Sequence, residues 1–322
     1  MDSVVDAIVA DAFPDTHATG VTPTRSGNNK QTVVATLADG REVVIQYREL
    51  GYGSLEPEGE VTRVVRAETD VPVPRVLACG ELDNHSYVVT ALVDGTNLHH
   101  EFEALSLADR RSVAAALGRY LGTIHETFTF DGYGAITVDD DRLHVESPTR
   151  DWRSWLRRYL DDGLAAFQPP LTDLVDPIRD AVHTGIDRLP DQPTPRFYPW
   201  DYRPGNVLVA GPQGPTIAAV IDWGDPLAAH RELSIANTEY LVADWYADPA
   251  AADELRAAYH DGYRATATIP EEYFEARRRI YRLTAITRSA YDSQGLVTRP
   301  RYPMVDDDAA AAFHRTHLES LL

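Results

Sequence analysis

The chain has 322 residues, of which 43% are hydrophobic, and a single cysteine. This length suffices for one large domain or two of ordinary size, and one cysteine excludes an internal disulfide and a cysteine-rich metal site. The sequence holds 50 acidic and 30 basic residues, a net charge of −20. Such a charge disfavours nucleic acid as a partner, because the phosphate backbone would be repelled over most of the surface.

The basic residues are almost all arginine, since Lys30 is the only lysine. An acidic, lysine-poor surface is typical of proteins that work in molar salt, so we expect a salt-adapted source. The sequence has no basic N-terminal segment followed by an apolar run, and no stretch of about 18 apolar residues. We therefore expect a cytoplasmic protein with neither a signal peptide nor a membrane span.

The N-terminal part of the chain predicts β structure. Two β-branched runs, 31–37 and 42–47, flank the tight-turn signal Asp39-Gly40 and predict a hairpin. The loop 26–30, Ser-Gly-Asn-Asn-Lys, comes just before this hairpin. Its backbone N–H groups can cover phosphates, so the loop is a candidate phosphate-binding segment.

Helical and β patterns alternate after the hairpin. Residues 58–67 carry valines at helical spacing, and the prolines of 71–74 end that helix. The run 86–93 predicts a strand, and Asp94-Gly95 predicts the turn after it. From Ser106 the apolar spacing becomes three and four residues, which predicts a mostly helical remainder.

The most informative segment runs from Asp201 to Asp222. Asp201-Tyr-Arg-Pro-Gly-Asn206 precedes a Val-Leu-Val strand, and the next apolar strand ends at Asp222. The three polar side chains can therefore gather at one end of a hairpin, where Asp201 would accept a hydroxyl proton and the other two would bind Mg²⁺. The alternative is a simple turn, because Pro, Gly and Asx residues also favour turns. The joint pattern favours a metal-dependent phosphoryl-transfer site.

These residues resemble the aminoglycoside phosphotransferase and choline kinase superfamily. The catalytic loop of that family usually reads His-Gly-Asp-x-x-Pro-x-Asn, and its metal-binding strand usually reads Ile-Asp-Trp/Phe. Asp201 and Asn206 match the loop, and Asp222 matches the metal-binding aspartate. The match is incomplete, because Pro199-Trp200 replaces the His-Gly pair and puts a bulky indole beside the expected base.

The resemblance implies an α+β, protein-kinase-like fold of two lobes. Residues 1–94 would form a small, β-rich nucleotide-binding lobe, and 95–322 a larger, mostly helical lobe for catalysis and substrate binding. Adenine would bond to the backbone between the lobes, and the loop before the hairpin would cover the phosphates. The residues that the resemblance places at the nucleotide are Gly27, Asn29, Lys30, Gln46, Arg48, Glu60, Ala91 and Val93.

The cation that would hold the nucleotide phosphates is not where the resemblance expects it. The family has a lysine on the third strand, paired with a helix glutamate that Glu60 fits, but this chain has Gln46 at the lysine position. Three readings stay open. Arg48, on the same face of the strand, reaches Glu60 and the phosphates; Lys30 supplies the charge; or nucleotide binding is impaired.

The residues and the resemblance together predict Mg²⁺-dependent transfer of the γ-phosphoryl group of ATP or GTP to a hydroxyl of a small molecule. Asn206 and Asp222 would hold the metal, and Asp201 would act as the base. Arg203 would stabilise the transferring group or pair with an acid. The acceptor would be an amino sugar, an amino alcohol or a similar metabolite, and the sequence leaves the oligomeric state open.

Two other functions are compatible with parts of the pattern. A catalytically degenerate protein on the same fold would bind a nucleotide or metabolite without turnover, which Gln46 and Pro199-Trp200 favour. A hydrolase would use Asp201 and Asp222 as paired carboxylates, but the intervening Asn206 disfavours it.

Two patterns in the helical part have no expected role in the site. His314 and His317, three residues apart, are a metal pair in principle, but no third ligand is evident in the sequence. We expect them on the surface. The arginines of 275–282 are interpreted as a core stripe or a solvated face rather than a cofactor site.

Overall fold

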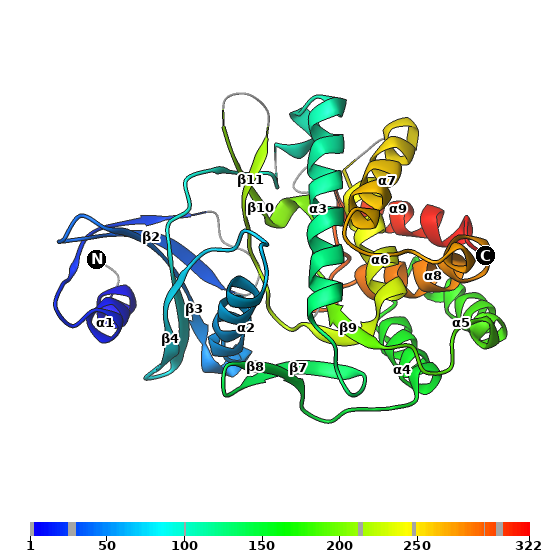
Figure 1. The fold of residues 1–322 in the computed structure, drawn as a ribbon, viewed down its shortest axis with the longest axis horizontal. Coiled ribbons are helices and arrows are strands. Elements are labelled where there is room, and N and C mark those ends of the chain that lie inside the picture. The colour runs from blue at the N-terminus through cyan, green and yellow to red at the C-terminus, as the bar shows by residue number, and fades with distance from the viewer. Residues whose placement is uncertain are drawn as a thin grey trace.

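A computed structural model of the protein describes residues 3–24, 30–99, 101–211, 215–246, 249–292, 294–300 and 305–322. Strands dominate the N-terminal part of the chain and helices dominate the rest (Figure 1). This confirms the expected α+β fold with a β-rich N-terminal region and a helical C-terminal region. Within the described residues, no helix is both long and apolar enough to cross a membrane.

The N-terminal region is built on a five-stranded antiparallel sheet of order β1-β2-β3-β5-β4. The hairpin expected from 31–37 and 42–47 is present as β2 and β3, and Gly40 in its turn has a φ of 85°, a conformation that glycine adopts without strain. The strands are β1 Ala18–Pro23, β2 Gln31–Leu37, β3 Glu42–Glu49, β4 Val76–Leu82 and β5 His85–Ala91.

The two faces of this sheet have different partners. Val43, Ile45 and Tyr47 alternate along β3 and are buried in a core that includes helix α1, Ser3–Ala12. The intervening Gln46 and Arg48 therefore point to the opposite face. Helix α2, Glu56–Glu68, packs on that opposite face, where a Cβ added to Gly59 would lie 2.9 Å from Cys79 Cβ.

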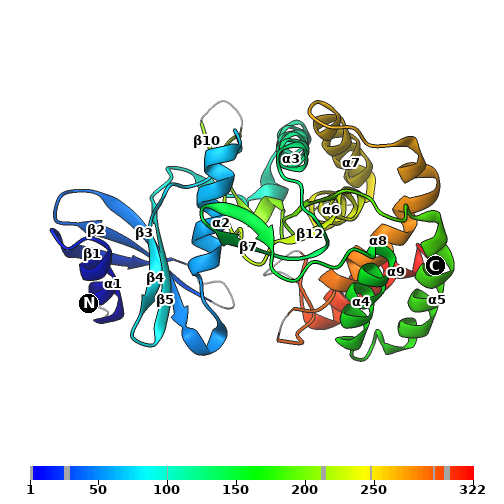
Figure 2. The same cartoon turned by 60° about the horizontal axis from the view of Figure 1, so that its bottom comes forward.

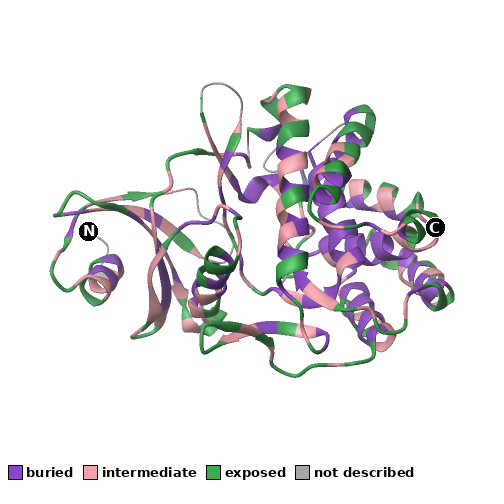
Figure 3. Cartoon of the chain, in the orientation of Figure 1, coloured by how far each residue is buried: buried purple, intermediate pink, exposed green. Residues whose placement is uncertain are grey.

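The C-terminal region is a group of helices with two small sheets between them and the first region (Figures 1 and 2). The helices are α3 Leu107–Thr127, α4 Trp152–Ala165, α5 Val175–Gly185, α6 Arg231–Glu239, α7 Pro249–Arg264, α8 Arg278–Ser289 and α9 Asp307–Glu319. The strands are β6 Thr96–Asn97, β7 Gly134–Asp139, β8 Arg142–Val145, β9 Pro195–Tyr198, β10 Val207–Ala210, β11 Thr216–Val220 and β12 Leu227–His230. Figure 3 shows that α6 and α8 are buried over most of their length.

Buried ion pairs lie at the centre of this helical region. Glu239, at the end of α6, is fully buried and bonds the guanidinium groups of Arg278 and Arg282. Arg282 also donates to Asp244 at 2.8 Å and is itself only 5% exposed. A solvated face is therefore the wrong description for Arg282, because two buried carboxylates neutralise its charge inside the protein.

His314 is also a core residue, so the expectation of a surface position was wrong for it. Its side chain is buried, with Nδ1 2.8 Å from the Tyr240 hydroxyl and Nε2 2.8 Å from the Thr298 carbonyl oxygen. Those two bonds use both ring nitrogens. Across the described segments, no cluster of three or more His, Cys, Asp or Glu side chains could hold a metal ion.

Candidate active site

The hairpin of β10 and β11 brings the three expected catalytic and metal-binding side chains to one end. Val207 pairs with Val220 in this antiparallel hairpin, and the Ile221 N–H donates to the Asn206 carbonyl oxygen at 2.9 Å. Asn206 directly precedes β10, and Asp222 follows β11 by two residues. The strand register therefore explains why residues sixteen positions apart meet at one edge.

Asn206 is bonded to Asp201. Its Nδ2 donates to the Asp201 carbonyl oxygen at 2.9 Å and to the carboxylate Oδ2 at 2.9 Å. Both amide hydrogens are then used on Asp201, which leaves Asn206 Oδ1 as the atom able to bind a cation. A buried asparagine with this arrangement fits the role of a metal ligand next to a base.

Asp222 is the second candidate metal ligand. Its backbone has a φ of 67°, in the left-handed region that aspartate tolerates better than most residues, and its side chain is 39% exposed. Burial raises the pKa of its carboxyl, but attraction and a hydrogen bond from Lys30 outweigh burial and leave the pKa below its usual value. A charged carboxylate and an amide oxygen suit Mg²⁺, which is commonly bound by few protein ligands together with substrate phosphates.

Arg203 is an internal partner of Asp201. Its Nε donates to Asp201 Oδ1 at 2.7 Å, and its Nη1 donates to the Tyr246 hydroxyl at 3.0 Å. The guanidinium carbon also lies 5.5 Å from the ring centre of Trp245, a cation–π distance. Burial opposes the charge of Arg203, but Asp201 raises the pKa of the guanidinium above its ordinary value. Two roles were expected for Arg203, and the structure shows one of them, the pairing with an acid, which is Asp201.

A side chain at position 205 would displace the groups around Arg203. A Cβ there would lie 2.6 Å from Arg203 Nη1, 2.7 Å from the Tyr246 hydroxyl and 2.8 Å from His99 Nδ1. His99, Trp245 and Tyr246 were missed by sequence reasoning, because residues so distant in the chain share no motif with the catalytic loop.

The glutamate of α2 that pairs with a lysine is Glu58 and not Glu60. Lys30 Nζ donates to Glu58 Oε1 at 2.7 Å and Oε2 at 2.9 Å, and to Asp222 Oδ1 at 3.0 Å. Glu60 lies two residues further on, about 200° round the helix, near Arg63 and Asp141. The ion pair that was expected for Glu60 is therefore made by Glu58, with Lys30 as its cation.

Arg48 does not reach either glutamate by a hydrogen bond. Its Nε donates to the Gly53 carbonyl oxygen at 2.9 Å and its Nη2 to the Ser54 carbonyl oxygen at 2.8 Å. Arg48 thus braces the loop that enters α2. Gln46 lies in the middle of the sheet, where its backbone pairs with Thr32 and Val88.

The other predicted nucleotide residues are placed only in part. Ala91 is the last residue of β5, and Val93 follows in the segment that leads to β6. Gly27 and Asn29 lie outside the described residues. Trp200 is 41% exposed, and Asn237 Nδ2 donates to its carbonyl oxygen. A residue of α6 therefore holds the loop at the point where the family usually has His-Gly.

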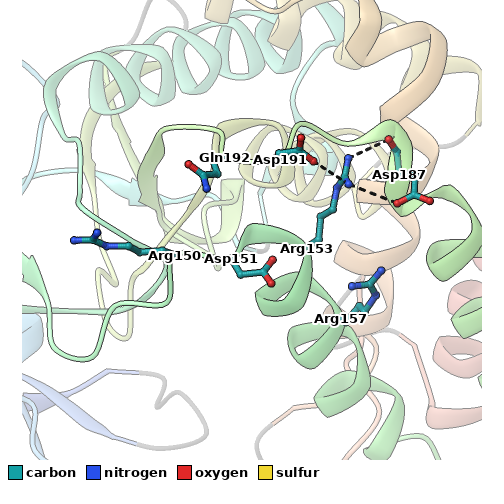
Figure 4. A pocket seen from close by; sticks show the side chains of 7 residues that line it. All are labelled: Arg150, Asp151, Arg153, Arg157, Asp187, Asp191 and Gln192. Carbon is teal, nitrogen blue, oxygen red and sulfur yellow. Dashed lines mark hydrogen bonds and ion pairs between the residues drawn. The ribbon is translucent and has the colours of Figure 1, made fainter.

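A hollow of about 540 Å³ lies away from the candidate active site, at the start of α4 (Figure 4). At its centre Arg153 forms ion pairs with Asp191 at 2.8 Å and with Asp187 at 3.5 Å. It shares no lining residue with the cluster around Asp201 and Asp222. Its lining residues are Arg150, Asp151, Arg153, Arg157, Asp187, Asp191 and Gln192.

Comparison with known proteins identifies the fold. A model of the phosphotransferase enzyme family matches residues 20–269. A putative fructosamine-3-kinase from Thermobifida fusca is 19% identical, with 100% of this chain and 98% of that chain covered at a TM-score of 0.61. A microcompartment-associated aminopropanol kinase is 17% identical, covering 99% and 96% at a TM-score of 0.59.

A third solved structure is an amicoumacin kinase in complex with AMP-PNP, Ca²⁺ and Ami, which is 15% identical, covering 93% of this chain and 88% of that chain at a TM-score of 0.62. A search of curated proteins finds no match. At these identities the solved structures bear on the fold, and they confirm the expected kinase-like arrangement.

Proposed function

Because the chain belongs to the phosphotransferase enzyme family and is a small-molecule kinase, we propose that it transfers the γ-phosphoryl group of ATP or GTP to a hydroxyl of a small molecule. The observation that carries this proposal is the meeting of Asp201, Asn206 and Asp222 at one end of the β10–β11 hairpin. The three groups are a base and two oxygen ligands, which is what phosphoryl transfer to an alcohol asks of a protein.

In this proposal Asn206 Oδ1 and the Asp222 carboxylate hold Mg²⁺. The bound metal supplies neutralising charge at the phosphates. The Asp201 carboxylate orients the acceptor hydroxyl and takes its proton as the acceptor oxygen bonds to the γ-phosphorus. The bond from that phosphorus to the β,γ-bridging oxygen breaks, and the electron pair leaves with the nucleoside diphosphate. Arg203 holds the Asp201 carboxylate in one orientation, since its Nε donates to Oδ1.

The degenerate alternative is disfavoured by how the two departures from the family pattern are accommodated. The loop carbonyl of Trp200 is held by Asn237, and a lysine already reaches the metal-binding aspartate despite Gln46. A chain without turnover has no reason to keep the base, both metal ligands and a paired arginine. We therefore propose turnover and not binding alone.

The acceptor that we propose is an amino sugar, an amino alcohol or a similar metabolite. The structurally similar fructosamine and aminopropanol kinases are named for acceptors of these two kinds. We propose that the nucleotide binds to 1–94 and the acceptor to 95–322, with adenine near Ala91 and Val93. The described residues of the acceptor side include the aromatic side chains of Trp245 and Tyr246 beside Arg203.

We also propose a cytoplasmic, salt-adapted protein that binds neither nucleic acid nor membranes. The net charge of −20 supports the salt adaptation and the absence of nucleic-acid binding, because such a surface repels anionic polymers and is stabilised when salt screens its self-repulsion. A midpoint of thermal unfolding that rises between about 0.1 M and about 2 M KCl would support the salt adaptation. A midpoint that falls over that range would contradict it.

The test of the proposed function is thermal unfolding in molar KCl with ATP, GTP or ADP, with and without Mg²⁺. A ligand at 100 times its Kd stabilises by about 2.7 kcal/mol, which should raise the midpoint by about 5–10 °C. We expect a shift that needs Mg²⁺ in the wild type and is lost in Asp222→Ala.

The matched control is Asp225→Ala, because Asp225 is also an exposed aspartate with a positive φ, 50° against 67° at Asp222. Asp225→Ala should introduce similar backbone strain and should keep the Mg²⁺-dependent rise of the unfolding midpoint. If no nucleotide raises the midpoint of the wild type, the degenerate reading takes precedence. If one does, the hydroxyl acceptors are screened for phosphorylated product.

A further inference from the structure

One departure from the expected kinase pattern, the missing lysine on β3, bears directly on how the nucleotide would be bound. We infer that Lys30, entering from the start of β2, is the cation that binds the nucleotide phosphates, and that Glu58 on α2 positions it. This inference rests on the proposed function and deepens it. In the resembling family a lysine on β3 binds the phosphates. Here that role goes to Lys30, just before β2, which pairs with Glu58 and not with Glu60.

The sheet register places Lys30 on the right face. Gln31 pairs with Tyr47, and Thr32 pairs with Gln46. Continued by one residue, this register puts Lys30 beside Arg48, and residues of equal parity share a face of the sheet. Lys30 therefore lies on the face of Gln46, towards α2 and away from α1. The Lys30 side chain therefore extends from the end of the neighbouring strand towards the region that a lysine at position 46 would face.

The contacts of the ammonium group fit this role. Lys30 Nζ is bonded to both oxygens of Glu58 and to Asp222 Oδ1, so it lies between the helix glutamate and the expected metal ligand. Its side chain is 15% exposed, and that of Glu58 is 12% exposed. A Cβ added to Gly224 would lie 3.4 Å from Glu58 Oε2, so Glu58 also lies beside the segment just after Asp222.

The number of donors on Lys30 indicates how the group would act. An ammonium has three N–H donors. Two are bonded to Glu58, which orients the side chain, and the third is bonded to Asp222. When Asp222 is engaged with a metal, the third donor becomes free for a phosphate oxygen, while the two bonds to Glu58 keep the ammonium in place.

Arg48 is the competing candidate, and its contacts disfavour it. Its Nε and Nη2 are bonded to two backbone carbonyl oxygens in the loop before α2. Gly53 in that loop has a φ of 93°, and a Cβ there would lie 3.3 Å from Arg48 Nη2. Two of the three guanidinium nitrogens are thus bonded to the loop.

The experiment measures ATP·Mg²⁺ affinity by calorimetry on the wild type, Lys30→Met, Arg48→Met and the double variant Lys30→Met/Gln46→Lys. We expect Lys30→Met to weaken binding by about 10-fold or more and Arg48→Met to weaken it less. The double variant returns a lysine to β3 and should recover affinity to within about 5-fold of the wild type. Arg41→Met is the control, because it removes a cation from the exposed turn of the same sheet, where Arg41 pairs with Asp39.

A second measurement uses the wild-type chain and so does not depend on a variant that folds. Because Lys30 is the only lysine, protein made with ¹³Cε-lysine gives one lysine signal in an NMR spectrum. That signal should move when ATP·Mg²⁺ is added and stay in place when adenosine is added, since adenosine carries no phosphate.

The outcomes separate this inference from the function on which it rests. A wild type that binds no nucleotide contradicts the proposed function, and the inference falls with it. A wild type that binds ATP·Mg²⁺ while Lys30→Met binds it equally well, or while Arg48→Met loses more affinity, overturns the inference alone. A lysine signal that ATP·Mg²⁺ leaves unmoved overturns it also.

Discussion

Asp201 accepts hydrogen bonds on both oxygens of its carboxylate, from Arg203 on one side and from Asn206 on the other. These bonds fix its orientation. The Asp–Arg–Tyr chain formed by Asp201, Arg203 and Tyr246 then extends from the catalytic loop to the end of the segment after α6. The orientation of the Asp201 carboxylate therefore depends in part on Tyr246, which lies far from it in the chain.

We expect Asp201→Asn to lower kcat by about 10²–10⁴-fold and to leave ATP affinity nearly unchanged, because the metal ligands remain. Steady-state kinetics and calorimetry measure the two quantities. Asp261→Asn is the matched control, since Asp261 forms an exposed ion pair with Arg264 at 3.3 Å on α7. Equal losses of turnover and of ATP affinity in Asp201→Asn would contradict its assignment as the base.

Tyr246 is a positioning residue in this arrangement. Its hydroxyl accepts from Arg203 Nη1 at 3.0 Å, and its ring packs against Phe102 with centroids 5.4 Å apart. Tyr246→Phe keeps the ring and removes the hydroxyl, so we expect kcat to fall by about 5–10-fold with the KM for ATP unchanged.

A matched variant separates positioning from a loss of stability. Tyr259→Phe also removes a buried hydroxyl, one that donates to the Ile235 carbonyl oxygen at 3.3 Å, and should change the unfolding midpoint without lowering kcat. If both variants lose turnover equally, the role of Tyr246 is structural only.

Among the elements, α3 and α7 form a close helix pair, side by side in Figures 1 and 2. Glycines allow their backbones to touch. A Cβ at Gly118 of α3 would lie 2.1 Å from the Tyr259 carbonyl oxygen, and one at Gly262 of α7 would lie 1.9 Å from the Ala115 carbonyl oxygen. Thr266 adds a bond across the pair, from its hydroxyl to the Arg119 carbonyl oxygen at 2.9 Å.

Gly262→Ala should therefore destabilise the protein by about 1–3 kcal/mol or more, since one methyl group forces the two helices apart. Denaturant unfolding in molar KCl measures the loss. Gly51→Ala is the control, because a Cβ at Gly51 would have no heavy atom within 4 Å. An unchanged midpoint in Gly262→Ala would show that α3 and α7 separate at little cost.

For the molecule as a whole, several ionisable groups are buried in a low-dielectric interior. Burial lowers the pKa of His230 to about 3 and of His314 to about 4. Burial raises the pKa of Glu232 to about 7, although Arg277 opposes the rise. Such groups link the free energy of unfolding to pH, with opposite signs for the two residue types.

His314 allows the sign to be tested. Its pKa in the folded protein lies below the ordinary value of 6.5, so its stabilising contribution is present above pH 6.5 and is lost as the pH falls towards 4. We expect the free energy of unfolding of the wild type to fall by about 2 kcal/mol relative to His314→Gln between pH 7.5 and about 5. His17→Gln, at an exposed histidine, is the control, and an equal change in both variants would contradict the prediction.

Much of the element order could be predicted from local patterns. The runs 31–37 and 42–47 and the helix at 58–67 correspond to β2, β3 and α2, whose observed bounds differ by at most two residues at each end. Hydrophobic periodicity and turn residues determine local structure over a few positions, so the sequence alone is enough to predict these elements. The helix glutamate was misplaced because Glu58 and Glu60 both lie in the first turns of α2, and only the direction of each side chain separates them.

The sequence by itself determined that Asp201, Asn206 and Asp222 meet, because a short hairpin brings its own two ends together whatever surrounds it. It also determined the charge of the surface, which is a property of composition. Only the tertiary structure decided that Lys30 pairs with Glu58 and Asp222, that Tyr246 holds Arg203, and that Arg282 is buried. Each of these depends on contacts between segments far apart in the chain, and such contacts follow from packing that no local pattern encodes.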